Sequence, residues 1–118
     1  MIGLFTDYDG TLALPERARE EGAIPPELER VLKELSALIP VAVVTTKDCQ
    51  FVRRRVPYAA AYACINGVEV HAGGYVAVAE ELRSAELEQL LPLVQRLNAF
   101  VEAKRTADGR LAGITVNW

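Results

Sequence analysis

The fold of this chain is decided by one stretch near its N-terminus, Phe5-Thr6-Asp7-Tyr8-Asp9-Gly10-Thr11-Leu12. Residues 1–6 are apolar without alternation, which is typical of a strand buried on both faces of a parallel sheet. Asp7 and Asp9 follow where this strand ends. Ligands of open parallel sheets bind at the carboxyl ends of the strands, so the stretch predicts that both carboxylates face a binding site. Two solvated acids in a surface loop are the alternative interpretation.

Hydrophobic spacing and turn residues predict the remaining elements. These are strands at 41–45 and 61–65, helices at 25–39 and 47–56, a hairpin at 68–71 and 75–78, a helix at 84–97 with a buried apolar stripe, and strands at 99–105 and 110–118. Their order indicates an α/β fold. We expect a partial Rossmann-like core with a parallel sheet in residues 1–80, followed by the start of a smaller α+β module in residues 81–118.

Composition excludes several classes of protein. The 118 residues are 51% hydrophobic and 25% charged, as in an ordinary globular domain. A net charge of −3 disfavours nucleic acid as a partner. The basic run at residues 53–55 is expected to be a solvated helix end. We find no signal peptide and no apolar stretch of the roughly 18 residues that a membrane span needs, so we expect a cytoplasmic protein with no membrane partner.

The cysteines and the histidine do not match a known site pattern. Cys49 and Cys64 form no C-x-x-C motif, and neither has a partner at zinc-ligand spacing. Free buried thiols are expected, with a disulfide between the two as the open alternative. His71 is the only histidine, and a structural role at the hairpin edge is expected for it.

The opening stretch closely resembles the nucleophile motif of the haloacid dehalogenase-like phosphatase superfamily. The resemblance implies that Asp7 is a nucleophile that becomes an aspartyl-phosphate, and that Asp9 is the acid/base. It implies that Mg²⁺ binds to the Asp7 side chain and the Asp9 backbone carbonyl. Tyr8, Gly10 and Thr11 would then surround the phosphate. A carboxylate nucleophile and a second carboxyl that acts as acid and then as base form a coherent pair.

Two further stretches resemble phosphate-site motifs of the same superfamily. Thr45 follows the second predicted strand, where relatives hold a phosphoryl oxygen with Ser or Thr, and Thr46 is a second candidate. The sequence Thr45-Thr46-Lys47 is closest to the Ser-Lys variant of mannosyl-3-phosphoglycerate phosphatases. Asn66 matches an Asn-Gly stretch of relatives with a large cap inserted after the third strand, where it lines the phosphate site. A helix cap at Thr45 and a plain turn at Asn66 are the alternatives.

Glu102 and Lys104 alternate with apolar residues, so they share one strand face. They resemble a Glu and a Lys that contact sugar in the cap of trehalose-phosphate phosphatases. Sucrose-phosphate phosphatases belong to the same capped group. A cross-strand surface ion pair is the alternative interpretation.

The resemblance implies a Mg²⁺-dependent phosphomonoester hydrolase acting on a small-molecule sugar phosphate or phosphoglycerate-type substrate. The superfamily also uses a lysine and a late acidic pair, and no such acidic pair follows residue 80. We therefore expect a fragment, or half of a split protein, that partners the missing C-terminal half or forms a homo-oligomer. A phosphomutase on the same scaffold and a non-catalytic subunit are the alternatives.

Overall fold

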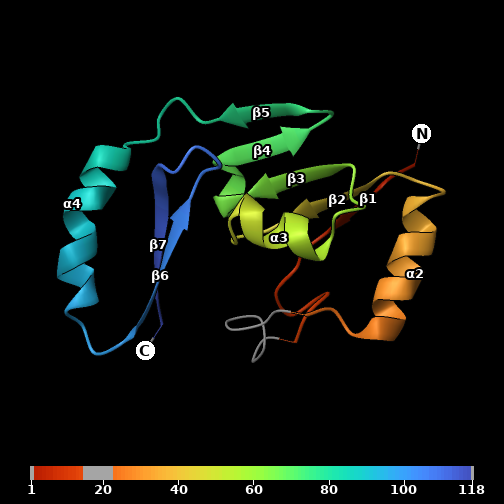
Figure 1. Cartoon of the computed structure of the whole chain (residues 1–118), viewed down its shortest axis with the longest axis horizontal. Coiled ribbons are helices and arrows are strands. Elements are labelled where there is room, and N and C mark those ends of the chain that lie inside the picture. Colours follow the sequence, from red (N-terminus) through yellow and green to blue (C-terminus); the bar gives the residue numbers. More distant parts are fainter. Residues whose placement is uncertain (1, 15–22, 118) are drawn as a thin grey trace.

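The structure, a computed structural model, describes residues 2–14 and 23–117 (Figure 1). Its elements are β1 (Leu4–Thr6), α2 (Pro26–Ser36), β2 (Val41–Val44), α3 (Cys49–Arg55), β3 (Ala61–Cys64), the 3-10 turn η1 (Ile65–Gly67), β4 (Glu69–Ala72), β5 (Tyr75–Val78), α4 (Ser84–Gln95), β6 (Phe100–Arg105) and β7 (Leu111–Asn117). Within these residues the predicted order of elements is confirmed. Residues 12–23 are rich in Glu and Arg and are expected to form a polar connection, and most of them lie outside the described residues.

Five strands form one sheet in chain order, from β1 to β5. The first three strands are parallel, and β4 and β5 join them antiparallel as the predicted hairpin. Local signals explain the two helices between the parallel strands. Proline opens α2, and the Asp48 carboxylate caps α3 by accepting a bond from the Phe51 N–H at 2.8 Å. The α/β architecture is therefore confirmed, with a sheet that is parallel only in its first three strands.

The prediction that β1 is buried on both faces is wrong. Val41 and Val43 of β2 are buried in one core cluster with Leu32 of α2 and Val52 of α3. Both helices therefore cover the same face of the sheet. Consecutive right-handed crossovers to neighbouring strands place helices on one side in this way. The opposite face of the first two strands is open, because the Phe5 side chain is 78% exposed.

The hairpin of β6 and β7 forms a second, two-stranded sheet. It reaches the core through Ala112, which belongs to the core cluster, and Gly113, where an added Cβ would lie 3.0 Å from Ile65 Cγ2. Helix α4 packs against β7, on the side of the hairpin away from the larger sheet (Figure 1). The predicted buried stripe of α4 is wrong, since no residue of this helix is buried. A narrow two-stranded sheet offers too little surface to cover it.

The prediction of free thiols is also wrong, because a disulfide joins Cys49 to Cys64. Strands β2 and β3 are parallel neighbours, so the residue that begins α3 comes beside the residue that ends β3. Their Cα atoms are 5.4 Å apart, a normal separation for a disulfide. The bridge ties together the two connections that follow β2 and β3.

None of the helices in the described residues has the length and apolar character required to cross a membrane.

Candidate active site

The carboxyl ends of the three parallel strands meet at one edge of the sheet. Asp7 follows β1, Thr45 follows β2 and Asn66 follows β3 after one residue. These three residues line a cavity of about 340 Å³ together with Thr46; Phe5, Thr6 and Val44 complete its lining. The structure therefore brings four of the predicted site residues, which span 60 positions of the sequence, around one hollow.

The connection after β1 is folded by its own hydrogen bonds. The Tyr8 N–H donates to Asp7 Oδ1 at 2.8 Å, which fixes the orientation of the Asp7 carboxylate. Gly10 has a φ of 79°, a conformation that glycine adopts without strain, and its N–H donates to the Ala13 carbonyl at 2.8 Å. The Thr11 hydroxyl lies 3.4 Å from Asp7 Oδ2, a weak contact. The Asp7 side chain is thus exposed and oriented, with one carboxylate oxygen held and the other nearly free.

Backbone bonds hold Thr45 and Asn66 beside each other. The Asn66 N–H donates to the Thr45 carbonyl at 3.2 Å, and Asn66 has a φ of 56°. The Thr45 side chain is buried, and its Oγ1 accepts a bond from the Lys47 N–H at 3.0 Å. Because that bond uses an acceptor position, the hydroxyl hydrogen is left to donate to an oxygen in the cavity. Thr46 and Asn66 are exposed at the cavity wall.

A charged group lies between the two sheets. Lys47 is 5% exposed, and its Nζ donates to Glu102 Oε1 at 3.2 Å and Oε2 at 3.3 Å. Lys104 is also buried, and this burial lowers its pKa, with the charge of Lys47 adding to the effect and Glu102 opposing it. The predicted face shared by Glu102 and Lys104 therefore points at the core, where Glu102 pairs with Lys47.

Asp9 belongs to the same group of charges. Its Oδ1 is buried and has no hydrogen-bond partner among the described residues. Burial raises its pKa, the charges of Lys47 and Lys104 lower it, and the charges of Asp7 and Glu102 raise it further. Asp9 does not line the cavity around Asp7. A carboxyl whose protonated form is favoured by burial suits an acid that donates a proton.

Three other predicted phosphate-site residues offer little to a ligand through their side chains or free N–H groups. The Tyr8 ring is buried and packs edge-on against Phe51 at 5.5 Å, and burial raises its pKa to about 12. The Gly10 N–H is already bonded, and the Thr11 hydroxyl faces Asp7. Sequence reasoning also missed a residue of the site, Lys47, although the Thr45-Thr46-Lys47 sequence itself carried that signal.

The Asp7 carboxylate suits a hard divalent cation, because its Oδ2 has only the weak contact to Thr11. Mg²⁺ commonly binds to one or two carboxylates while keeping several waters. The Asp7 carboxylate therefore fits part of a Mg²⁺ shell, to which the resemblance adds the Asp9 backbone carbonyl.

The sequence of this chain matches no protein-family model and no curated protein. Its structure is similar to that of a trehalose-6-phosphate phosphatase related protein, with 19% identity, a TM-score of 0.68, and coverage of 86% of this chain and 47% of that chain. It is also similar to the C-terminal domain of the trehalose-6-phosphate phosphatase of C. albicans, with 18% identity, a TM-score of 0.70, and coverage of 86% and 39%. A third similar structure is that of a haloacid dehalogenase-like hydrolase from B. subtilis. It has 20% identity and a TM-score of 0.59, and the match covers 87% of this chain and 36% of that chain.

These similarities concern the fold. The chain has the fold of haloacid dehalogenase-like phosphatases, so the resemblance seen at Asp7 is confirmed at the level of architecture. The chain spans less than half the length of each of these three structures.

Proposed function

We propose that this chain, which has the fold of haloacid dehalogenase-like phosphatases, carries the nucleophile half of an enzyme that hydrolyses sugar phosphates or phosphoglycerate-type esters. One observation carries the proposal: Asp7, Thr45, Thr46 and Asn66 line a single cavity at the carboxyl ends of parallel strands. This is where open α/β sheets bind their ligands.

Asp7 is the nucleophile in this proposal. Its carboxylate is exposed, and the Tyr8 N–H holds Oδ1 while Oδ2 remains available to attack phosphorus. Attack forms an aspartyl-phosphate and expels the sugar oxygen, which divides one difficult displacement into two easier ones. The Thr45 hydroxyl, with Thr46 and Asn66, would donate to the phosphoryl oxygens and keep the group in line with Asp7.

Asp9 acts as the acid and then as the base. Burial raises its pKa, which favours the protonated form that gives a proton to the departing sugar oxygen. The resulting carboxylate then takes a proton from the water that attacks the aspartyl-phosphate. Asp9 lies outside the lining of the Asp7 cavity in the ligand-free structure, and catalytic contacts of this kind often tighten only when substrate binds.

A divalent cation completes the site in this proposal. The Asp7 carboxylate and the Asp9 backbone carbonyl would hold Mg²⁺, which when bound offsets the repulsion between a phosphate dianion and the acidic side chains. The chain contributes positive charge of its own through Lys47 and Lys104. Both lysines are near enough to Asp9 to lower its pKa.

The hairpin of β6 and β7 would select the substrate. Lys104 is buried, and Glu102 is a quarter exposed beside Lys47. Carboxylate and ammonium groups held together in this way match the hydroxyl groups of a sugar. Trehalose-6-phosphate phosphatases among the similar structures make a sugar phosphate the first substrate class to test.

A non-catalytic subunit is the second candidate. The open face of β1 and β2 exposes Phe5 and Val44, whose side chains are 78% and 45% accessible. A complementary chain that covers this face would bury apolar surface and supply further catalytic residues. The chain alone would then bind phosphate without turnover.

The test is a phosphatase assay with p-nitrophenyl phosphate, trehalose 6-phosphate and 3-phosphoglycerate at saturating Mg²⁺. Asp7→Asn should abolish turnover, a loss on the order of 10⁴-fold or more. Asp9→Asn should cost roughly 10²- to 10⁴-fold. The matched control is Asp108→Asn, since Asp108 is an exposed acid of the β6–β7 turn.

The assay separates the candidates. Release of inorganic phosphate identifies a phosphatase, whereas transfer of the phosphoryl group to a second sugar hydroxyl identifies a phosphomutase. Phosphate binding by the unmodified chain, without turnover, supports the non-catalytic subunit. Turnover that survives Asp7→Asn contradicts the mechanism.

A further inference from the structure

His71 and Glu69 place two buried polar atoms against each other without a hydrogen bond. Both residues lie in β4 and are less than a tenth exposed. His71 Nε2 lies 3.3 Å from Glu69 Oε1, and neither atom has a hydrogen-bond partner among the described residues. Buried polar atoms are normally satisfied, so this pair requires an explanation.

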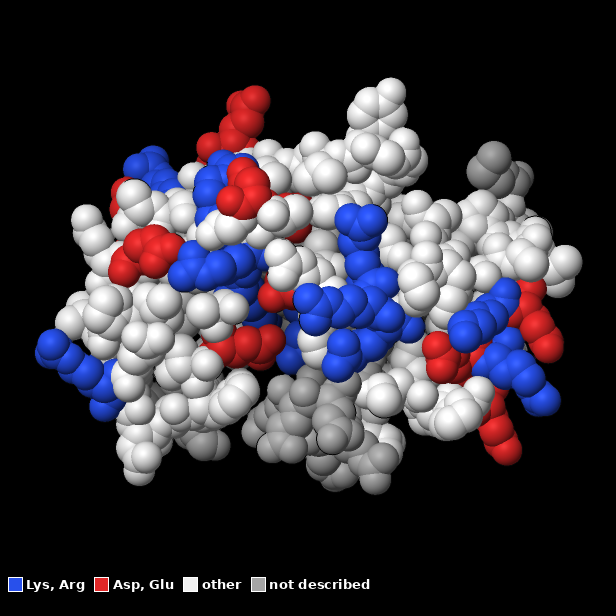
Figure 2. Space-filling model, in the orientation of Figure 1, with Lys and Arg blue, Asp and Glu red and all other residues white. Residues whose placement is uncertain are grey.

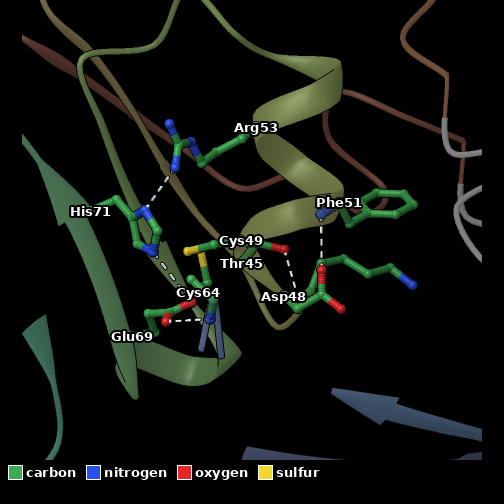
Figure 3. Close-up of a disulfide and its surroundings, with 10 residues drawn as sticks. Thr45, Asp48, Cys49, Phe51, Arg53, Cys64, Glu69 and His71 are labelled. Carbon is green, nitrogen blue, oxygen red and sulfur yellow. Dashed lines mark hydrogen bonds and ion pairs between the residues drawn. A yellow bond between two sulfur atoms is a disulfide. The ribbon is translucent and has the colours of Figure 1, made fainter. Parts of the chain in front are cut away.

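The outer contacts of these residues fix their orientation. The Glu69 carboxylate accepts a bond from the Ala107 N–H at its other oxygen, Oε2, at 2.8 Å. Nδ1 of His71 lies 3.1 Å from Arg53 Nη1, and Figure 3 shows the histidine ring between Arg53 and Glu69. The basic run at residues 53–55 is therefore more than a solvated helix end. Because these contacts hold Glu69 Oε2 and His71 Nδ1, the remaining atoms, Glu69 Oε1 and His71 Nε2, point toward each other.

The disulfide lies beside these two atoms (Figure 3). One ligand atom each of Cys49, Glu69 and His71 lie within 4.8 Å of one another, and Cys64 is bonded to Cys49. Reduction of the disulfide would add two thiols to the nitrogen and oxygen already present. Two thiolates, an imidazole and a carboxylate are ligands that zinc binds in a tetrahedral arrangement.

Solvent reaches this cluster from outside. A cavity of about 330 Å³ is lined by Cys49, Arg53, His71 and Ala107, among others. It lies apart from the cavity at Asp7, with no lining residue in common. Figure 2 shows Lys and Arg gathered over α3 at the centre of this face of the molecule. The cavity itself, rather than this basic surface, gives a small reductant or a hydrated cation a path to Cys49 and His71.

We propose that reduction of the Cys49–Cys64 disulfide creates a zinc site formed by Cys49, Cys64, His71 and Glu69. This site is separate from the proposed phosphatase function and does not depend on it. Soft thiolates favour zinc over the hard cation expected at Asp7. The Ala107 N–H would hold the Glu69 carboxylate in orientation from outside.

The chemistry needs a dithiol reductant. One of its thiolates attacks a disulfide sulfur, and its second thiolate resolves the mixed disulfide, so the reductant leaves as a cyclic disulfide. Both electrons end on Cys49 and Cys64, whose thiols lose their protons when zinc binds. His71 then binds zinc through Nε2 and carries its proton on Nδ1. Arg53 is exposed and is free to turn away from that proton.

The test uses cobalt(II) as a coloured probe of the 118-residue chain. The protein is reduced with dithiothreitol, freed of it without oxygen, and titrated with cobalt(II) and then zinc. We expect one equivalent of cobalt(II) with a thiolate charge-transfer band and a tetrahedral visible spectrum, both displaced by zinc. The oxidised protein should show neither band, because the sulfurs are bonded to each other.

Variants assign the ligands. His71→Asn and Glu69→Gln should each weaken binding by at least about 100-fold. Glu102→Gln and Asp7→Asn are the matched controls and should leave the thiolate band unchanged. Folding of each variant is measured first in the oxidised protein by circular dichroism, where the disulfide is intact.

Several results would overturn the proposal. These are a reduced chain that shows no thiolate band, a His71→Asn variant that binds as tightly as the unmodified chain, and a reduced chain that unfolds and is not refolded by zinc. In each case His71 and Glu69 would be a structural ion pair only.

Discussion

The pair of Lys47 and Glu102 offers the sharpest test of how the two sheets are joined. Lys47 Nζ contacts both oxygens of Glu102, at 3.2 and 3.3 Å, across 55 positions of the sequence. The Lys47 side chain is 7% exposed and that of Glu102 is 24% exposed. The perturbation is a double-mutant cycle of Lys47→Met and Glu102→Gln, since each change removes a charge and nearly preserves the volume.

The magnitude follows from the burial of the two partners. Breaking a fully buried ion pair costs about 3–5 kcal/mol, because one charge is left unpaired without water. Water still reaches a quarter of the Glu102 side chain, so it compensates part of that loss. We therefore expect a coupling free energy of about 1–2 kcal/mol, within the usual range for residues in contact.

Urea unfolding of the four proteins, followed by circular dichroism, measures this coupling. The control is the same cycle on Lys33 and Glu29 of α2, a more accessible pair at 3.6 Å whose side chains are 56% and 35% exposed. That pair should give about 0.3–0.5 kcal/mol. A coupling for Lys47 and Glu102 no larger than the control would refute the claim that this contact joins the hairpin to the core.

Three further predictions concern single residues. Burial lowers the pKa of Lys104, so its stabilising contribution is present above the unfolded value of 10.5 and is lost as the pH falls through the folded pKa. Lys104→Met should therefore be more stable than the unmodified chain at pH 7, and this advantage should shrink as the pH approaches 10.5, as urea unfolding across this range will show. The same variant should bind a sugar phosphate more weakly in a binding titration. Gly113→Ala places a Cβ 3.0 Å from Ile65 Cγ2, and thermal unfolding should show a loss of about 1 kcal/mol. Tyr8→Phe removes a buried hydroxyl that has no partner among the described residues, so unfolding should show a change of less than about 1 kcal/mol or a small gain.

Local patterns predicted the elements because their causes are local. Proline at the start of α2 and the Asp48 cap of α3 can be read from the sequence. The juxtaposition of Asp7, Thr45 and Asn66 also follows from sequence, since parallel strands bring their carboxyl ends to one edge. The chemical roles of these residues stay predictions.

What the sequence did not predict depends on contacts between distant parts of the chain. The exposure of Phe5 depends on which face of the sheet the helices cover, and hydrophobicity alone does not reveal that. The Cys49–Cys64 disulfide required knowledge that β2 and β3 are neighbours. The burial of His71 and the pairing of Lys47 with Glu102 depend on where the β6–β7 hairpin docks, for which no short motif carries a signal.

Trapping of a phosphoryl group on the chain tests the central claim most directly. The protein is mixed with Mg²⁺ and acetyl phosphate or a sugar phosphate, quenched in acid, digested and mapped by mass spectrometry. The account predicts one phosphoryl group on the peptide that contains Asp7, absent from Asp7→Asn and retained in Asp108→Asn. A phosphoryl group on any other residue, or none in a protein that nevertheless hydrolyses the ester, would contradict it.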